Sequence, residues 1–141
     1  MDKTIKIIIV VALLSAVVVA VAVRKNRAGA QEMPEEYKPE NLLGKGLPTL
    51  VDLGSDTCVS CKMMISVIDE LRTQYAGRLQ VNFLDVHEYP DLISLYGVTI
   101  IPTQIFYDGS GKELFRHEGF YPTDDILAKW KELGVELAAA K

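Results

Sequence analysis

Cysteine, proline and glycine are scarce in this sequence, and their scarcity excludes several classes of protein. Two cysteines among 141 residues cannot build a disulfide-rich framework. Six prolines and ten glycines are too few for a collagen-like or low-complexity chain, and 49% hydrophobic residues exclude disorder over most of the length. The sequence also has no internal repeats. Its length predicts one domain with one appendage rather than a multidomain protein.

Basic residues are scarce outside the first thirty positions. Residues 1–30 carry five basic side chains and one acidic one, a net charge of +4, whereas residues 31–141 carry ten basic and eighteen acidic ones, a net charge of −8. A nucleic-acid-binding protein normally presents a basic surface, because binding to phosphates releases counterions. The acidic main part of the chain therefore argues against nucleic acid as a partner.

One long hydrophobic run is present, from residue 7 to residue 23, and Ser15 is its one polar side chain. As a helix it would span roughly 25 Å, slightly less than a hydrocarbon core of about 30 Å, and flanking Lys and Arg side chains can extend to the interface. The alternatives are a cleaved signal peptide and a buried core helix. We favour an uncleaved anchor, because a basic cluster, Arg24 to Arg27, follows the run.

The side of the membrane on which the main part lies is predicted from two opposing arguments. Two lysines precede the run and three basic residues follow it, which weakly favours a cytoplasmic domain by the positive-inside rule. Long domains, however, cross largely regardless of flanking charge, and a basic amino terminus before an apolar run is typical of export signals. We expect the domain outside the cytoplasm, in the periplasm or another extracytoplasmic space.

The polarity pattern predicts four segments: an anchor at 1–23, a polar linker at 24–46, a folded domain at 47–135 and a frayed tail at 136–141. Within the linker, a short helical turn is expected from Pro39 to Leu43. In the domain we predict strands at 49–53, 79–86, 103–107 and 113–118, and helices at 59–75, 90–96 and from Thr123 as a capping residue to Leu133. This order predicts an α/β fold with a mixed sheet that helices cover on both faces.

Cys58 and Cys61 are separated by two residues, at the predicted start of a helix. A thiolate there can attack a foreign disulfide, and a second nearby thiol can resolve the mixed disulfide. We predict that Cys58, at the helix amino terminus, attacks, and that the more buried Cys61 resolves. Because the domain is acidic, thiolate stabilisation is expected to come mostly from backbone amides.

Other uses of the cysteine pair are a half zinc site, a metal or cluster shared across a homodimer, and an inert disulfide. Zinc prefers four ligands, and His87 and His117 fit no ligand spacing. A disulfide between Cys58 and Cys61 would close too small a loop to contribute much by chain entropy. Redox chemistry is therefore favoured, with no metal and no cofactor.

Several motifs agree in order and spacing with those of the thioredoxin superfamily, which the sequence resembles over the whole globular part. The matching segments are Leu50-Val51-Asp52-Leu53, Cys58 to Lys62, Tyr96-Gly97-Val98, Ile101-Pro102-Thr103 and Gly119. The resemblance implies a thioredoxin-like three-layer α/β/α fold with a mixed central sheet, preceded here by one transmembrane helix. With its anchor and its Val-Ser dipeptide, the chain is similar to membrane-tethered thioredoxin-like reductases, including the thioredoxin domain of the transmembrane disulfide-interchange reductase.

The resemblance also assigns roles to residues outside the cysteine pair. Pro102 would follow a cis peptide bond, which leaves the backbone of Ile101 free to pair with an extended partner segment. Thr57 and Gly119 would lie at the substrate-binding surface. The alternative for Pro102 is an ordinary trans proline that opens a strand.

Asp52 would be the buried carboxylate behind Cys61, with a raised pKa that lets it accept the proton of the resolving thiol. The alternative is a solvated or ion-paired aspartate at a strand end. Departures from the family pattern are Thr57 in place of a tryptophan, Ser60 in place of a proline, and Phe83 at the position of the lysine that faces the carboxylate. Four further side chains are candidates for an apolar rim for partner docking: Met63, Ile100, Phe120 and Tyr121.

These observations predict a membrane-anchored thiol:disulfide oxidoreductase that reduces other proteins outside the cytoplasm and contributes to cell redox homeostasis. The resemblance implies a monomer that receives electrons from a membrane thiol carrier and passes them to disulfide-containing proteins, with apocytochromes, and hence cytochrome c biogenesis, as one case. The alternatives are a disulfide-forming oxidant or isomerase, and a binding module with this fold that performs no catalysis.

Overall fold

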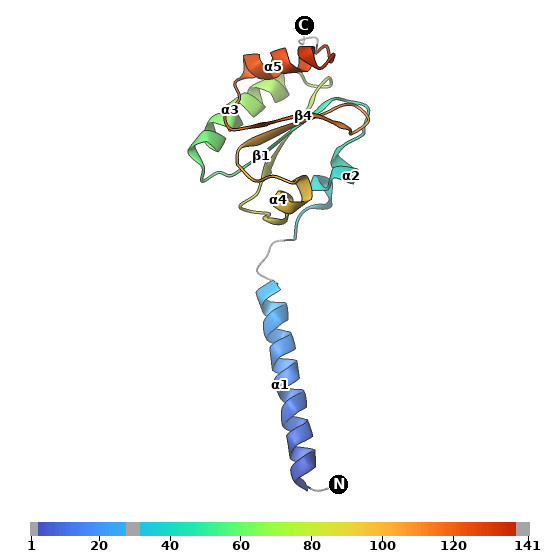
Figure 1. Ribbon diagram of the computed structural model, residues 1–141, viewed down its shortest axis with the longest axis vertical. Coiled ribbons are helices and arrows are strands. Elements are labelled where there is room, and N and C mark those ends of the chain that lie inside the picture. The colour runs from blue at the N-terminus through green and yellow to red at the C-terminus, as the bar shows by residue number, and fades with distance from the viewer. Residues whose placement is uncertain (1–2, 28–31, 138–141) are drawn as a thin grey trace. The chain divides into compact units, whose positions relative to one another are not determined.

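The computed structural model describes residues 3–27 and 32–137, and the chain divides into two compact units, Met1–Glu32 and Met33–Lys141 (Figure 1). Parts of three predicted segments lie outside the described residues. These are the first two residues of the anchor, residues 28–31 of the linker and residues 138–141 of the tail.

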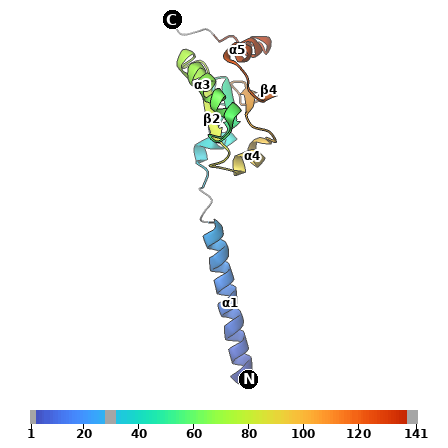
Figure 2. The ribbon, with the colours of Figure 1, turned by 90° about the vertical axis from the view of Figure 1, so that its left-hand side faces the viewer.

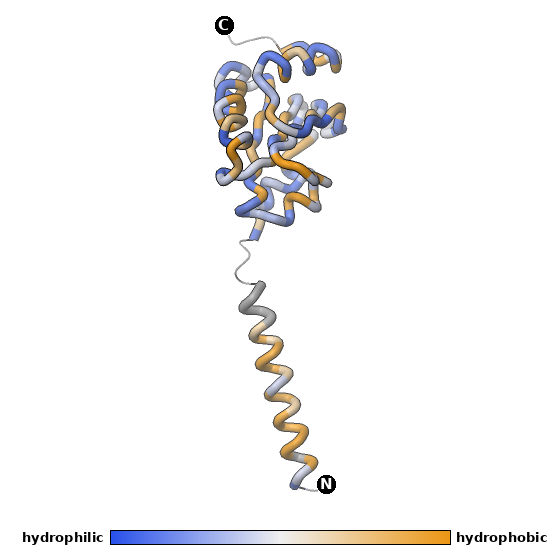
Figure 3. Tube along the Cα trace, turned by 60° about the vertical axis from the view of Figure 1, so that its left-hand side comes forward, coloured by the Kyte–Doolittle hydropathy of each residue, from blue (hydrophilic) through white to orange (hydrophobic). Residues whose placement is uncertain are grey.

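The first unit consists of helix α1, Lys3–Arg27. Over Lys3–Ala22 its mean hydropathy is 3.0, and Figure 3 shows the hydrophobic colour along most of the helix. At about 1.5 Å per residue, twenty residues extend about 30 Å, which is the thickness of a bilayer core. The helix is therefore long and apolar enough to cross a membrane, a property that an amino-terminal signal sequence shares.

The second unit is built on a four-stranded mixed sheet in the order β2-β1-β3-β4. Its strands are β1 (Thr49–Gly54), β2 (Gln80–Asp85), β3 (Thr103–Tyr107) and β4 (Glu113–Glu118). Strand β1 pairs in parallel with β2 and antiparallel with β3, and β3 and β4 form an antiparallel hairpin. The prediction of a mixed sheet is confirmed. All six β1 residues are buried, because β1 is a central strand with both faces covered.

Helices α3 (Val59–Gln74) and α5 (Thr123–Glu132) cover one face of the sheet, as Figures 1 and 2 show. The apolar stripe of α3 packs with Trp130 of α5 against Leu50 and Phe106 of the sheet. The rings of Phe106 and Trp130 lie 4.7 Å apart between centroids. This cluster fixes the direction of α3 and therefore the position of its first turn.

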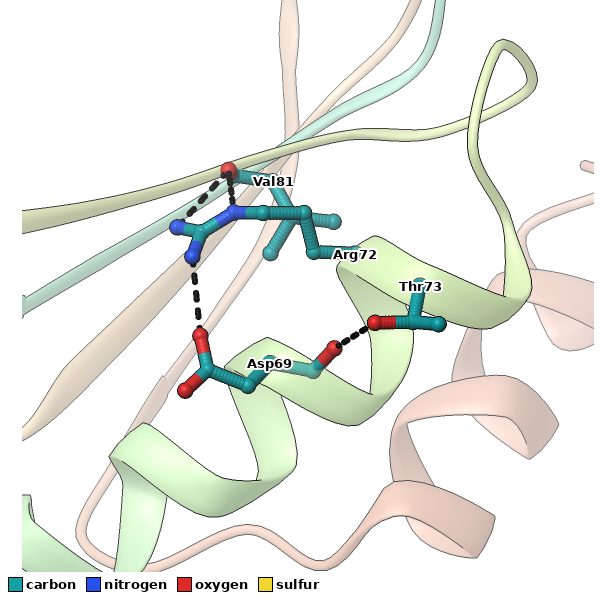
Figure 4. Close-up of polar contacts among 4 residues, drawn as sticks. All are labelled: Asp69, Arg72, Thr73 and Val81. Carbon is teal, nitrogen blue, oxygen red and sulfur yellow. Dashed lines mark hydrogen bonds and ion pairs between the residues drawn. The ribbon is translucent and has the colours of Figure 1, made fainter.

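Arg72 attaches α3 to the neighbouring strand β2 (Figure 4). Its Nε and Nη2 atoms each donate to the carbonyl oxygen of Val81 at 3.3 Å, and its Nη1 lies 2.9 Å from Asp69 Oδ1. One turn on, the Thr73 hydroxyl donates to the Asp69 carbonyl oxygen at 2.8 Å. The guanidinium thus links the helix to the strand beneath it.

The other face of the sheet is covered by α4 (Asp91–Tyr96) and by the segment that precedes β1. That segment contains the 3-10 turn η1 (Glu35–Tyr37) and α2 (Pro39–Leu42), so the short helical turn expected in this part of the chain is present. The Tyr96 hydroxyl donates to the Tyr37 carbonyl oxygen at 2.7 Å, and Leu42 is buried in the core. Residues 33–46 therefore belong to the packed unit.

Two glycines join this segment to the β3–β4 turn. The Gly46 amide donates to the Gly109 carbonyl oxygen at 2.9 Å. A Cβ atom on Gly109 would lie 2.8 Å from the Gly46 carbonyl oxygen, closer than real Cβ atoms approach. Only a residue without a side chain permits this backbone contact.

Thr123 is not the capping residue that the sequence predicted for α5. The N-cap position is Pro122, without a side-chain hydrogen bond, and Thr123 is the first helical residue. Its hydroxyl donates instead to Glu70 Oε2 of α3 at 2.6 Å. The prediction was wrong because the proline starts the helix one residue earlier and the threonine hydroxyl has an acceptor on the adjacent helix.

Candidate active site

The cysteine pair lies where β1 ends and α3 begins. Cys58 is the N-cap residue of α3, and its Sγ accepts the Cys61 amide at 3.4 Å. The Ser60 hydroxyl lies 3.2 Å from the same sulfur. Cys58 is half-buried and Cys61 is fully buried, and both are free thiols. The sequence prediction of one accessible and one covered sulfur at a helix start is therefore met.

The two sulfurs have opposite electrostatic environments. Hydrogen bonds from the Cys61 thiol, the Ser60 hydroxyl and the Cys61 amide, in that order of importance, lower the pKa of Cys58 to about 7. Burial, and next the hydrogen bond to Cys58, raise the pKa of Cys61 to about 12. At neutral pH Cys58 is therefore about half thiolate, whereas Cys61 remains a thiol.

The expectation that backbone amides dominate the stabilisation of the Cys58 thiolate was wrong. The two largest contributions come from side chains, the Cys61 thiol and the Ser60 hydroxyl. Ser60 stands at the loop position where the family usually has proline, which has no hydroxyl to donate. The sequence analysis noted Ser60 only as a departure and missed its contact with the sulfur.

Asp52 lies in the middle of β1 and is fully buried. Burial raises its pKa from 3.8 to about 7, and a hydrogen bond from Gln104 partly opposes this rise. Gln104 Nε2 donates to Asp52 Oδ1 at 2.7 Å, whereas Asp52 Oδ2 has no hydrogen-bond partner within the described part of the chain. Asp52 also contributes electrostatically to the raised pKa of Cys61. The buried alternative for Asp52 is thus the one that the structure supports.

Gln104 was missed by the sequence analysis, although a signal was present. It stands next to Thr103 in a short strand that continues with apolar residues, and it is a fully buried amide. The same kind of signal, a single aspartate in an apolar strand, directed attention to Asp52. What the sequence does not contain is the register that pairs Asp52 with Gln104.

Phe83 pairs with Asp52 on the other neighbouring strand, β2. Its ring packs so closely on the end of β1 that a Cβ atom on Gly54 would lie 2.8 Å from Phe83 Cε2 and 3.2 Å from Cys61 Cβ. The place where the family pattern has a lysine is therefore occupied by an aromatic ring beside Cys61. Asp52 has no cation in either of its cross-strand positions.

Pro102 lies at the same end of the sheet as the cysteine loop, because Leu53 pairs with Thr103 at the start of β3. The Ile101–Pro102 peptide bond is cis, as the resemblance implies, and Pro102 is buried while Ile101 is half-buried. Gly119 follows β4, with φ at 101°, and its amide donates to the Pro102 carbonyl oxygen at 2.8 Å. The loop before β3, with Ile101 and Pro102, and the loop after β4, with Gly119, therefore lie at the same end of the sheet as the cysteines.

Thr57 precedes Cys58 and is exposed. Its hydroxyl oxygen lies 2.8 Å from Ser55 Oγ, which also accepts its amide at 3.2 Å. These contacts order the loop before the first cysteine. Thr57 therefore presents a small polar group where the family pattern has an indole.

Apolar side chains are exposed around the loops at this end of the sheet. Ile100 is 53% exposed, Met63 52% and Phe120 38%, whereas Tyr121 is half-buried. Val59, which the sequence analysis did not select, is the most exposed of this group at 79%. Such side chains can contact an apolar partner surface.

Neither histidine joins the cysteine pair in a metal site. His87 is exposed, and the ring of His117 stacks on Tyr121 with 4.0 Å between centroids. Among residues 3–27 and 32–137, no group of three or more metal-binding side chains is present. The chemistry that the described residues support is therefore that of the dithiol with its buried carboxylate.

Comparison with known proteins gives a consistent result. A family model described as Thioredoxin matches residues 30–132. Thioredoxin 1 of Nostoc sp. (strain PCC 7120 / SAG 25.82 / UTEX 2576) is 35% identical over 85 residues, which are 60% of this chain and 78% of that protein. A thioredoxin of Synechocystis sp. (strain ATCC 27184 / PCC 6803 / Kazusa) is 39% identical over 70 residues, 50% of this chain and 65% of that protein.

A solved structure shows the same fold. The crystal structure of chloroplastic thioredoxin z aligns with a TM-score of 0.58 over 64% of this chain and 80% of that one. The two chains are 24% identical, so this likeness concerns the fold alone.

Proposed function

The chain belongs to the thioredoxin family and is a thiol:disulfide oxidoreductase with a CxxC active site, and we propose that it works as a membrane-anchored reductant outside the cytoplasm. Family membership implies disulfide-containing proteins as partners. The observation that carries the proposal is the contrast between the two sulfurs, since Cys58 ionises near pH 7 and Cys61 only near pH 12.

Disulfide exchange proceeds in two steps that use these sulfurs in turn. The Cys58 thiolate attacks one sulfur of a partner disulfide, forms a mixed disulfide, and releases the other partner sulfur as a thiolate. Cys61 then loses its proton and attacks Cys58, which releases the second partner sulfur. The products are a Cys58–Cys61 disulfide and a reduced partner, so two electrons pass from the dithiol to the partner.

Asp52 accepts the proton of Cys61 in the second step. A carboxylate whose pKa is about 7 is ionised in about half of the molecules at neutral pH, and it is a stronger base than an exposed aspartate. Its burial next to Cys61 supports this role, because the Cys61 thiol is itself fully buried and cannot pass its proton directly to solvent. In the oxidised product Asp52 returns the proton to solvent.

The loop of Ile101 and Pro102 holds the partner segment. The half-buried Ile101 backbone pairs with an extended peptide in the manner of an added strand, and the neighbouring Thr57 and Gly119 border that segment. The hydrogen bond from the Gly119 amide to the Pro102 carbonyl oxygen supports this assignment, because it orders the loop before a partner arrives.

The pKa of Cys58 supports the proposed direction of exchange. A strongly depressed pKa, down to about 3.5, stabilises the reduced dithiol and makes the disulfide an oxidant. The value of about 7 for Cys58 equals the value of about 7 that is typical of reducing thioredoxins. A thiolate stabilised this little supports a reductant over an oxidant or isomerase.

Residues 1–23 are the anchor in this proposal, residues 47–135 with the packed segment 33–46 the catalytic domain, and residues 136–141 the tail. The apolar helix over Lys3–Ala22 supports the anchor. A membrane thiol carrier supplies electrons, and disulfide-containing proteins such as apocytochromes receive them. A monomer suffices in this proposal, because each chain carries both sulfurs of the site.

Trapping of partners tests the exchange itself. The full-length Cys61→Ser variant should accumulate mixed disulfides through Cys58, since nothing resolves them, and these should be visible as adducts on non-reducing gels. The matched control, Cys58→Ser with Cys61→Ser, should form none. A double variant that retained full activity would indicate a binding module without catalysis.

Three further measurements test the direction of exchange, the location of the domain and the fate of the amino-terminal helix. Equilibration of the full chain with glutathione and dithiothreitol couples should give a potential below about −200 mV, whereas a value near −120 mV would indicate an oxidant. Protease added to intact spheroplasts should degrade the domain if it lies outside the cytoplasm. The mass of the mature chain distinguishes an anchor from a cleaved signal.

A further inference from the structure

Four side chains form one row across the sheet, on the face that α3 covers. Phe83, Asp52, Gln104 and His117 are successive cross-strand partners on β2, β1, β3 and β4. Because side chains alternate along a strand, residues paired in register point to the same face. Leu50 and Phe106, two residues from Asp52 and Gln104, pack in the cluster beneath α3 and thereby identify that face.

Within this row, Gln104 is the side chain that contacts the carboxylate. Both residues are fully buried, and the distance from Gln104 Nε2 to Asp52 Oδ1 is 2.7 Å. The two remaining polar atoms, Asp52 Oδ2 and Gln104 Oε1, have no hydrogen-bond partner within residues 3–27 and 32–137. One carboxylate oxygen of Asp52 therefore accepts a hydrogen bond from an amide, and the other is buried without a hydrogen-bond partner among the described residues.

We propose that Gln104 is a positioning residue for the resolving step: its amide holds Oδ1 of Asp52, so that Oδ2 is the atom that takes the proton from Cys61. This inference rests on the proposed function of Asp52 and adds a residue to it. A hydrogen bond fixes the plane of the carboxyl group on one side. After proton transfer, Oδ2 carries the proton and Oδ1 still accepts from Gln104.

A neutral donor suits this role better than a cation does. An ion pair would stabilise the carboxylate strongly and make it a weak base, whereas an amide hydrogen bond stabilises it only moderately. The pKa of Asp52 reflects both effects, because burial raises it and the hydrogen bond from Gln104 lowers it to a smaller extent. Phe83, on the opposite side, contributes no charge.

The titratable groups around the pair are few. From α3, Cys61 interacts electrostatically with Asp52, and Cys58 interacts with Cys61. From β4, His117 pairs with Gln104, and its ring stacks on Tyr121. A test must therefore separate the titration of Asp52 from that of Cys58.

The test follows the resolving step alone in the full chain in detergent. Cys58 is first loaded with 2,2′-dithiodipyridine at acid pH, where Cys61 resolves slowly, and the pH is then raised. The first pyridinethione reports attack by Cys58, and the second reports attack by Cys61. Once Cys58 is in the mixed disulfide it no longer titrates, so its ionisation does not affect the second release.

The wild-type rate of the second release should rise with pH, with a midpoint near 7. In Gln104→Met, which keeps the length of the side chain and removes the donor, the midpoint should move up by about one pH unit. The second release should then be slower by about threefold to tenfold at neutral pH, with the first release unchanged. Gln104→Glu, whose carboxylate repels that of Asp52 above its own ionisation, should move the midpoint in the same direction and serves as the second variant if Gln104→Met does not fold.

The control is the same change in an Asp52→Asn background, where Gln104→Met should leave the second release unchanged. An unshifted midpoint in both folded Gln104 variants overturns the inference, and so does an equal shift in the Asp52→Asn background. Absence of any second release in the wild type would instead refute the proposed function, which keeps the two failures distinct.

Discussion

The buried Asp52 makes the stability of this protein depend on pH in a direction that can be calculated. The folded-state pKa, about 7, lies above the ordinary value of 3.8 because burial disfavours the ionised form. The folded protein therefore binds a proton more tightly than the unfolded chain does between these two values, and stability falls as pH rises through that range. At about 1.4 kcal/mol for each pKa unit, the loss reaches about 4 kcal/mol above pH 7.

The substitution Asp52→Asn removes this penalty and keeps the shape of the side chain, including an oxygen that can accept from Gln104. At about pH 3 the variant and the wild type should be almost equally stable, because Asp52 is then neutral in the folded state and largely neutral in the unfolded one. Above pH 7 the variant should be more stable by about 4 kcal/mol, although it resolves mixed disulfides slowly. Solvent does not weaken the effect, since the side chain is fully buried.

Urea unfolding of the reduced, full-length protein in detergent measures the difference, with the fluorescence of the single, fully buried Trp130 as the probe. For an m value of about 1–3 kcal/mol/M, the midpoint of the variant should lie more than about 1 M higher at alkaline pH. The exposed Asp56 offers a matched control, since Asp56→Asn should change the midpoint little at either pH. An Asp52→Asn gain that is the same at acid and alkaline pH would refute the reasoning.

Two further predictions follow from contacts of the active-site loop and of the segment before β1. Ser60→Ala removes the hydroxyl 3.2 Å from the Cys58 sulfur, so the pH midpoint of Cys58 alkylation by iodoacetamide should move above its wild-type value of about 7; an unchanged midpoint would show that the hydroxyl does not stabilise the thiolate. Gly109→Ala places a methyl group 2.8 Å from the Gly46 carbonyl oxygen, and because neither backbone can move away easily, it should lower the free energy of unfolding in urea by about 1–3 kcal/mol. In Gly77→Ala the added methyl group meets no atom within 4 Å, so any loss of stability there comes from the positive φ of Gly77 and not from a clash.

Much of the fold could be predicted from local patterns in the chain. The apolar stripe of Met64, Ile68 and Leu71 predicted α3, and it is the face that packs on the sheet. The strands predicted at 103–107 and 113–118 coincide with β3 and β4, which form the antiparallel hairpin. These predictions succeed because the burial of one face of a helix or strand leaves a periodic trace in the sequence.

Other features had no such trace. Thr123 looked like a capping residue, but its hydroxyl found Glu70 on a helix that is distant in the sequence. The segment before β1 looked like a polar linker, yet Leu42 and Tyr37 pack into or against the core. Both outcomes depend on which surfaces the fold brings together, and local composition does not record that.

The order of the elements, the dithiol at a helix start and the single carboxylate in an apolar strand were determined by the sequence itself, because spacing and periodicity act over a few neighbouring residues. The tertiary structure decided which side chains surround those groups. The register of β1 and β3 pairs Asp52 with Gln104, and the packing of Phe83 against Gly54 and Cys61 leaves that carboxylate without a cation. Strand register and burial depend on contacts between distant segments, and these same contacts set the ionisation of the groups that exchange disulfides.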